Sequence, residues 1–344
     1  MLRREFLSGV IGSAAGSAAL FDPDPDPSRR TYRNPVFGEV FADPTVVRAD
    51  DGTFYAYATY NDWGQPWRRP LVPIARSETL VEWERAGEAF AEKPGWTGDD
   101  GLWAPDIARL AGRYVLYYAV AQFGERNPAI GVAVSDSPAG PFEDRGPLLR
   151  SAEIGVPNTI DPELLVDDGV PYLFFGSHRG IYGVRLAPGG LSLAGEPFQI
   201  AGRGVEAACL VRRNGRYYFF GSRGTCCEGA ESTYRVVVGR APSLRGPYRN
   251  RAGEPLSRAP GTTILRGDDT FAGPGHNAIV RDDDGADWIV YHAYERMDPW
   301  AGPIPRRVLM IDRLRWADGW PTVAGRSPSE RARRPATGSG GLFG

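Results

Sequence analysis

Five short aromatic segments, each following a glycine turn, constrain the fold of this chain more than any other feature of its sequence. The segments are residues 54–59 (FYAYAT), 114–119 (YVLYYA), 172–177 (YLFFGS), 217–222 (YYFFGS) and 288–293 (WIVYHA). The turns before them are Asp51-Gly52, Ala111-Gly112, Asp168-Gly169, Asn214-Gly215 and Asp284-Gly285. Asp-Gly and Asn-Gly are strong hairpin signals, because both residues tolerate the positive φ of a tight turn. An apolar stretch precedes each turn, so the sequence predicts a strand, a tight turn and a second strand, repeated five times.

The spacing of the repeats indicates an all-β, five-bladed β-propeller. Successive segments begin 60, 58, 45 and 71 residues apart, which suits four-stranded sheets joined by loops of different lengths. The alternative is a large β-sandwich, in which hairpins also recur but no fixed polar position need recur with them.

A polar position does recur with the hairpins. Counting back 11 residues from the start of each segment gives Asp43, Trp103, Asp161, Glu206 and Asn277, the last next to His276. Equivalent positions on the innermost strands of a propeller face one another around its channel, so we expect these residues to converge on one pocket. The alternative is that the two Asp-Pro dipeptides only form turns that open strands.

Glu206 argues for chemistry rather than for a turn. It lies in the apolar segment GVEAACL (204–210), where burying a carboxylate costs several kcal/mol unless other groups compensate. Burial and a neighbouring carboxylate would raise its pKa, as a general acid requires, while an ionised carboxylate opposite would act as general base. Such a pair performs glycosidic hydrolysis. Trp103, Phe123 and the loop around Trp63 and Trp67 could provide apolar faces for sugar rings, although ordinary packing explains many such aromatics.

Charge and cysteine content exclude other classes of protein. The chain has 40 basic and 42 acidic residues, a net charge of −2, so no overall field attracts nucleic acid or an anionic membrane. Three cysteines, Cys209, Cys226 and Cys227, are too few and too badly spaced for a disulfide framework or a four-ligand zinc site.

The ends of the chain are predicted to lie outside the propeller. Residues 1–31 are predicted to hold a twin-arginine export signal, from Arg3-Arg4 through an uncharged stretch to Leu20, and an Asp-Pro spacer. A helical leader that is retained is the alternative. We expect the propeller to span residues 32–326 and residues 327–344 to form a flexible tail.

Several motifs resemble glycoside hydrolase family 43, and within it the endo-α-1,5-L-arabinanases. They cover nearly the whole body in order: 42–48 (ADPTVVR), 102–107 (LWAPDI), 116–124 (LYYAVAQFG), 159–163 (TIDPE), 205–207 (VEA), 224–229 (GTCCEG), 232–240 (STYRVVVGR) and 275–277 (GHN). The Asp-Pro pieces are signals of the family, and the segment with Cys226 and Cys227 points to the arabinanases.

The resemblance implies an inverting mechanism with Asp43 as general base, Glu206 as general acid and Asp161 tuning and orienting the acid. Inversion places the acid and base carboxyls roughly 6.5 to 9.5 Å apart. It also implies Trp103 and Phe123 as walls around the bound sugar, and we expect Ser177 to contact substrate.

A calcium ion near the active site, with His276 as a ligand, is likewise implied only by the resemblance. One departure from the pattern follows Ser177, where His178-Arg179-Gly180 replaces the aromatic-containing segment expected in arabinanases. The sequence does not decide whether Cys226 and Cys227 form a disulfide or remain thiols.

The leading interpretation is therefore a secreted, monomeric endo-arabinanase. It would cleave α-1,5 linkages within arabinan, with no nucleic-acid partner and no membrane association after signal removal. An exo-acting α-L-arabinofuranosidase or β-xylosidase on the same fold is the alternative, because loops select between chain ends and interiors. From other classes, a non-catalytic sugar-binding propeller and a protein-interaction propeller remain open.

Overall fold

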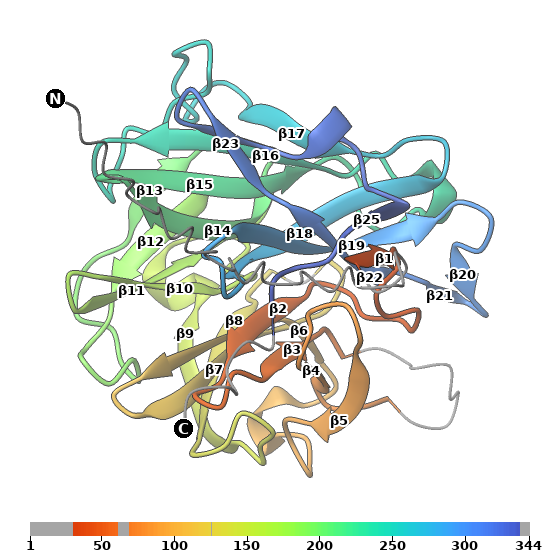
Figure 1. The fold of residues 1–344 in the computed structure, drawn as a ribbon. Helices are drawn as coiled ribbons and strands as arrows, with labels where there is room; N and C mark the ends of the chain where they lie inside the picture. The colour runs from red at the N-terminus through yellow and green to blue at the C-terminus, as the bar shows by residue number, and fades with distance from the viewer. Residues whose placement is uncertain (1–29, 61–68, 125, 338–344) are drawn as a thin grey trace, which may run out of the picture.

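The computed structural model describes residues 30–60, 69–124 and 126–337, which form a five-bladed β-propeller (Figure 1). The predicted export signal, nearly all of the spacer and the loop around Trp63 and Trp67 lie outside the described residues. No helix in the described ranges has the length and apolar character needed to cross a membrane.

Four blades are antiparallel sheets of four strands in sequence order. They are β2 (Thr45–Arg48), β3 (Phe54–Tyr57), β4 (Pro73–Ser77) and β5 (Glu84–Glu88); β6 (Gly101–Leu110), β7 (Arg113–Ala121), β8 (Ala129–Ser135) and β9 (Glu143–Arg150); β10 (Glu163–Asp167), β11 (Val170–Phe175), β12 (Ile181–Arg185) and β13 (Phe198–Ala201); β14 (Glu206–Arg213), β15 (Arg216–Arg223), β16 (Arg235–Ala241) and β17 (Thr262–Arg266). The fifth blade contains β18 (Phe271–Arg281), β19 (Asp287–Glu295) and β22 (Val308–Arg313).

Short elements connect or extend the blades. They are α1 (Ser151–Ile154), η2 (Gly95–Thr97), η3 (Gly229–Glu231), η4 (Ala324–Arg326) and the two-stranded sheets β20 (Trp300–Ala301) with β21 (Ile304–Pro305), β23 (Arg315–Ala317) with β24 (Trp320–Thr322), and β1 (Thr31–Arg33) with β25 (Arg331–Arg333).

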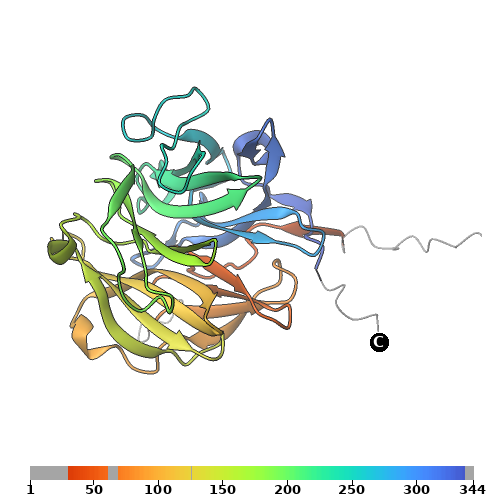
Figure 2. The same ribbon diagram turned by 90° about the vertical axis from the view of Figure 1, so that its left-hand side faces the viewer.

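The aromatic segments contain the second strands of the blades, and they are rich in apolar residues because both faces of these strands are buried. Side chains alternate between the two faces of a strand. In β15, Tyr218 and Phe220 pack toward the fifth blade, whereas Tyr217 and Phe219 pack toward the third. The described residues form five hydrophobic clusters, and each lies between two neighbouring blades. The hydrophobic core is therefore a ring of five clusters between blades. Figures 1 and 2 show the arrangement of the sheets themselves.

The predicted tight turn occurs in three of the five hairpins. Ala111-Gly112, Asp168-Gly169 and Asn214-Gly215 are two-residue turns with positive φ at both positions, which is the type I′ geometry. The other two hairpins differ from the prediction, because Arg48 pairs with Phe54 and Arg281 with Asp287, leaving five-residue loops.

The N-terminal segment closes the ring by joining the last blade. The fifth blade has three strands, and β22 is the outermost. Phe37 forms an antiparallel bridge with Leu309 of β22, at the place that a fourth strand occupies in the other blades. Asn34 extends this edge, since its side-chain oxygen accepts the N–H of Ile311 (3.1 Å) and its amide donates to the carbonyl of the same residue (2.9 Å).

The end of the chain corrects one expectation from the sequence. The structure places residues 327–337, predicted as part of a flexible tail, in an ordered path in which β25 pairs with β1. The Asn34 amide also donates to the carbonyl of Ser329 (2.9 Å). The described part of the predicted tail thus takes part in closing the ring of blades. Its polar composition gave no sign that it pairs as a strand with the N-terminal segment.

Asn34→Ala is expected to destabilise the protein by about 1–3 kcal/mol, because it leaves the buried N–H of Ile311 without its acceptor, while the carbonyl of Ile311 keeps the hydrogen bond donated by the Tyr32 hydroxyl (2.7 Å). Urea unfolding measures this loss. Arg33→Ala, at the exposed neighbouring position, serves as control and should stay within about 0.5 kcal/mol of wild type. Equal stabilities of the two variants would contradict the assigned closure.

Candidate active site

The chain enters each innermost strand through a non-glycine residue in the left-handed region of backbone conformation. These residues occupy equivalent places on the five blades and are Asp43 (φ 55°), Ala104 (41°), Asp161 (55°), Ala207 (55°) and His276 (48°). Register shifts in β6, β14 and β18 mark the same point. Since a left-handed L-residue costs roughly 1–2 kcal/mol, other contacts must hold these five positions.

Side chains from the preceding blade hold four of the five. The N–H of Ala104 donates to Thr59 Oγ1 (2.9 Å), and that of Ala207 donates to Asp161 Oδ2 (3.0 Å). In the same way, the N–H of His276 donates to Ser222 Oγ (2.8 Å), and that of Asp43 donates to His292 Nδ1 (3.0 Å). Each bond fixes a strand entrance and joins two blades, so the positions of the functional side chains depend on the ring itself.

These entrances surround one pocket, as the sequence predicts. Its lining comes from all five blades and their loops: Asp43, Thr59, Trp103, Ala104, Phe123, Ile160, Asp161, Glu206, Cys226, Cys227, Tyr234, His276 and Arg307. The three predicted carboxylates therefore share a cavity, and His276 lies beside them. Asn277, the counted fifth position, is instead buried next to the pocket, and its amide has no hydrogen-bond partner in the described part of the chain.

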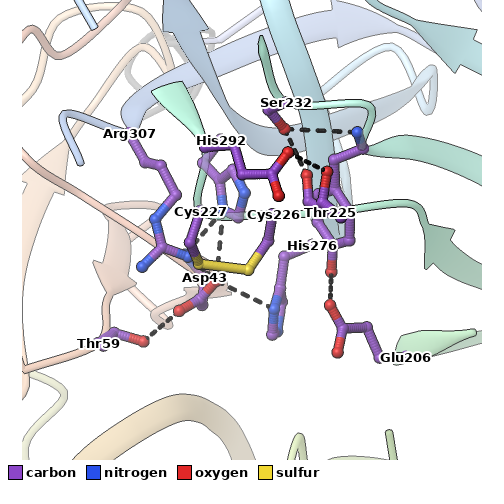
Figure 3. Close-up of a disulfide and its surroundings, with 12 residues drawn as sticks. Asp43, Thr59, Glu206, Thr225, Cys226, Cys227, Ser232, His276, His292 and Arg307 are labelled. Carbon is purple, nitrogen blue, oxygen red and sulfur yellow. Dashed lines mark hydrogen bonds and ion pairs between the residues drawn. A yellow bond between two sulfur atoms is a disulfide. The ribbon is translucent and has the colours of Figure 1, made fainter. Parts of the chain in front are cut away.

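Asp43 is surrounded by positive charge and hydrogen-bond donors (Figure 3). Arg307 Nη1 lies 2.8 Å and His276 Nδ1 3.2 Å from Asp43 Oδ1, while the Thr59 hydroxyl donates to Oδ2 (2.5 Å). Burial alone would raise the pKa of Asp43, but Arg307 and His276 hold it well below its usual value. Asp43 is thus ionised at neutral pH, which a base requires.

His292, behind Asp43, is neutral. Its Nδ1 accepts the N–H of Asp43, so the ring proton is on Nε2. Burial and the charge of Arg307 push the pKa of His292 well below its usual value. The ring stacks on Tyr234, with centroids 5.7 Å apart and planes within 8°.

Glu206 is bordered by three hydrogen-bond donors. Ser177 Oγ (2.6 Å) and His178 Nε2 (3.0 Å) contact its Oε2, and the hydroxyl of Tyr234 donates to Oε1 (2.7 Å). Burial acts to raise the pKa of Glu206, yet the hydrogen bond and charge of His178, with the two hydroxyls, lower it below its usual value. The expectation of a raised pKa for Glu206 is therefore wrong for the protein without substrate. The sequence did not indicate that these three donors surround the carboxyl.

Asp161 shows the opposite behaviour. Burial raises its pKa to about 7, and the charges of Glu206 and Asp43 add to this against the effect of His276 and of the Ala207 N–H. A carboxyl that titrates near neutrality beside Glu206 couples the protonation of the two groups.

Two aromatic rings and a disulfide form walls of the pocket. Trp103 and Phe123 lie with ring centroids 5.1 Å apart, and Phe123 is 87% exposed. Cys226 and Cys227 form a disulfide between adjacent residues, and both line the pocket with Asp43 and His276 (Figure 3). A disulfide that closes so small a loop adds little entropic stabilisation, so its effect is on the shape of the wall.

Ser177 is placed differently from the expectation of substrate contact. It is 1% exposed, is absent from the pocket lining and donates to Glu206, so it orients the carboxyl instead.

The metal-binding expectation rests on His276 alone. Its Nδ1 faces Asp43, and the described residues contain no group of three or more His, Cys, Asp or Glu side chains arranged to hold a metal ion. Residues 30–60, 69–124 and 126–337 therefore show no cluster of carboxylate ligands of the kind calcium prefers.

Two further carboxyls, the buried Asp106 and the half-buried Glu163, are structural. Asp106 accepts the N–H of Leu164 (2.7 Å), and Glu163 accepts that of Leu210 (3.1 Å), so each joins its blade to the next. Burial raises the pKa of both, that of Asp106 to about 6. Neither lines the pocket.

Sequence reasoning missed Arg307, His292, Thr59 and Tyr234 as parts of the site. A signal for one of them was present, since three aromatic segments end in a hydroxyl residue, Thr59, Ser177 or Ser222, and each contacts a pocket group of the next blade. Arg307 lies outside the repeat and carried no comparable signal.

Comparison with known proteins agrees with this geometry. The family described as glycosyl hydrolases family 43 matches residues 32–321. An extracellular endo-α-(1→5)-L-arabinanase of Bacillus subtilis is 34% identical, over 91% of this chain and 96% of the relative. An extracellular exo-α-(1→5)-L-arabinofuranosidase of Cellvibrio japonicus is 32% identical, over 82% and 85%. The structure of an α-L-arabinanase of Cellvibrio cellulosa complexed with arabinohexaose has a TM-score of 0.73 and 32% identity, covering 82% of this chain and 95% of that one.

Thr59→Val is expected to destabilise the protein by about 1–3 kcal/mol, because it removes the acceptor for the Ala104 N–H and the donor to Asp43 while keeping the shape. Thr59→Ser keeps the hydroxyl and is the matched control, expected near wild type. Denaturant unfolding of both variants measures the difference, and a valine variant as stable as the serine variant would show that this hydroxyl does not hold the strand entrance.

Proposed function

This chain belongs to glycosyl hydrolases family 43, and from that premise we propose that it hydrolyses α-1,5-L-arabinofuranosidic linkages within arabinan. The observation that carries the proposal is the meeting of Asp43, Asp161 and Glu206 in one pocket, from three different blades. Neither a sugar-binding nor a protein-interaction propeller requires an ionised carboxylate and two coupled carboxyls at one point.

In the proposed reaction, Asp43 is the general base. It takes a proton from a water molecule on one face of the sugar, and the water oxygen bonds to the anomeric carbon. Glu206 gives its proton to the leaving oxygen, which keeps the electron pair of the broken C–O bond. Because the water attacks opposite the leaving group, the configuration inverts. The charge of Arg307 keeps Asp43 ionised before the proton moves.

Asp161 is proposed to tune and orient Glu206. Its Oδ2 accepts the N–H of Ala207, the residue directly after Glu206, and so fixes the backbone from which the acid projects. Its negative charge, when present, also opposes ionisation of Glu206.

The aromatic pair Trp103 and Phe123 is proposed to bind the arabinofuranosyl unit nearest the chemistry. The high exposure of Phe123 leaves a face open to a sugar ring, and such rings stack on apolar surfaces. Exo action remains the second candidate, because a similar Cellvibrio japonicus protein is named an exo-arabinofuranosidase.

A calcium ion at His276 is proposed only as a weakly held ion. With one imidazole and no cluster of ligating side chains in the described residues, water would supply most of its ligands. Its charge would favour ionised carboxylates nearby, and no proton transfer above depends on it.

Export and a monomeric state are proposed on separate grounds. Two similar proteins are named extracellular, and Arg3-Arg4 with the uncharged stretch that follows suits the twin-arginine route. The described chain closes its own ring, so it needs no second copy to complete the fold.

Glu206→Gln and Asp43→Asn are each expected to lower kcat on linear arabinan by roughly 100- to 10,000-fold, because each removes one proton-transfer group. Binding of an arabino-oligosaccharide, measured by calorimetry, should persist. Asp136→Asn, at an exposed position outside the pocket, is the control and should keep full activity. Wild-type kcat in the Glu206 variant would show that another group is the acid.

Endo action predicts that the viscosity of linear arabinan falls early, before much arabinose is released. Proton NMR should show the first reducing ends in the β configuration, since inversion of an α linkage gives the β anomer. Arabinose as sole product would indicate exo action, and initial α anomers would exclude inversion.

A further inference from the structure

His178, the first residue of the segment that departs from the arabinanase pattern, is held directly against Glu206. It follows β11 in the left-handed region (φ 47°). Its N–H donates to the carbonyl of Val205 (2.9 Å), and its carbonyl accepts the N–H of Gly204 (2.9 Å). The chain leading into Glu206 is thus bonded to the backbone of His178, and this places Nε2 3.0 Å from Glu206 Oε2.

The surroundings of Glu206 favour its ionised form, whereas a general acid must be protonated. The three side chains that contact its carboxyl oxygens in the described residues, Ser177, His178 and Tyr234, are all placed to donate hydrogen bonds, which stabilises the carboxylate rather than the acid. An inverting hydrolase needs a proton at this point when the glycosidic bond breaks.

Only one of the three neighbours can supply that proton near neutrality. The serine hydroxyl does not titrate there, and burial holds the pKa of Tyr234 well above its usual value. His178 is the remaining group. The hydrogen bond with Glu206 raises the pKa of His178, partial burial and Arg223 act against this, and Asp161 adds to it.

We propose that His178 holds, in the resting enzyme, the proton that Glu206 delivers to the leaving oxygen. The proton moves from His178 Nε2 to Glu206 Oε2, leaving a neutral imidazole and a carboxylic acid. Glu206 then passes it to the glycosidic oxygen as the C–O bond breaks. His178 acts through Glu206 and is therefore a positioning residue, and the inference rests on the proposed role of Glu206 as acid.

The exposure of the His178 and Glu206 side chains is consistent with His178 taking up the proton and Glu206 delivering it. The imidazole is 51% exposed, whereas the Glu206 side chain is 11% exposed. Solvent can therefore return a proton to His178 after each turnover, while the carboxyl stays shielded.

The pH dependence follows from counting protons on the pair. At neutral pH the pair holds one proton, and activity falls when that proton is lost, so the alkaline limb of kcat/KM reports the pair and not the carboxyl alone. Without His178, the proton must be held by Glu206 itself, and the limb moves to lower pH. Loss of the positive charge of His178 would raise the pKa of Asp161, so Asp161 does not account for a limb that moves to lower pH.

His178→Gln tests the inference through the pH profile of kcat/KM. The alkaline limb should move to lower pH by about one unit or more, while the acid limb is unchanged and activity on the acidic plateau stays within about threefold of wild type. Arg179→Gln removes a charge from the exposed neighbour and is the control, expected to keep the wild-type limbs. An unmoved alkaline limb, or an equal loss at every pH, would overturn the proposal.

A second measurement does not depend on activity. The chain has three histidines, His178, His276 and His292, so the imidazole ¹⁵N signals can be assigned by single substitution. The pKa of His178 should fall toward the ordinary value in Glu206→Gln. No change would overturn the inference, even in an active enzyme. A wild type without arabinan hydrolysis, together with the expected fall, would instead contradict the proposed function.

Discussion

The left-handed entrance to each innermost strand is the constraint on which the rest of this molecule depends. Five non-glycine residues accept a conformation that is unfavourable for them, at one point of each blade. Side chains of the preceding blade hold four of these residues through the backbone N–H. Packing between blades and placement of the carboxylates are therefore one problem, because a blade that shifted would release the bond that aims its neighbour's side chain.

The same arrangement gives chemically identical groups different charges. Asp43 and Asp161 share a conformation and lie at equivalent points, but Arg307 and His276 keep Asp43 ionised whereas burial and neighbouring carboxylates raise the pKa of Asp161 to about 7. Inside a low-dielectric pocket, nearby positive charges decide the state of a carboxyl. The difference between the two aspartates comes in part from a residue outside the five-fold repeat, Arg307.

The sequence predicted the features that recur in every blade, and it did not predict the contacts that occur only once in the fold. The aromatic segments reveal blades because both faces of each strand are buried, and counting from them locates Asp43, Asp161 and Glu206. Ring closure by Asn34 and β25 was not predictable, since it pairs short polar segments about 300 residues apart. The direction of the pKa shift of Glu206 was predicted wrongly for a related reason. An apolar segment indicates burial, which raises the pKa, but the hydrogen-bond donors that lower the pKa come from other segments.

The most direct test of the account is a crystal structure of Glu206→Gln with an arabino-oligosaccharide bound. The account predicts a glycosidic oxygen within hydrogen-bond distance of the substituted side chain at position 206, with Asp43 and an ordered water on the opposite face of the anomeric carbon. A sugar bound outside the pocket, or one with both side chains on the same face, would contradict it.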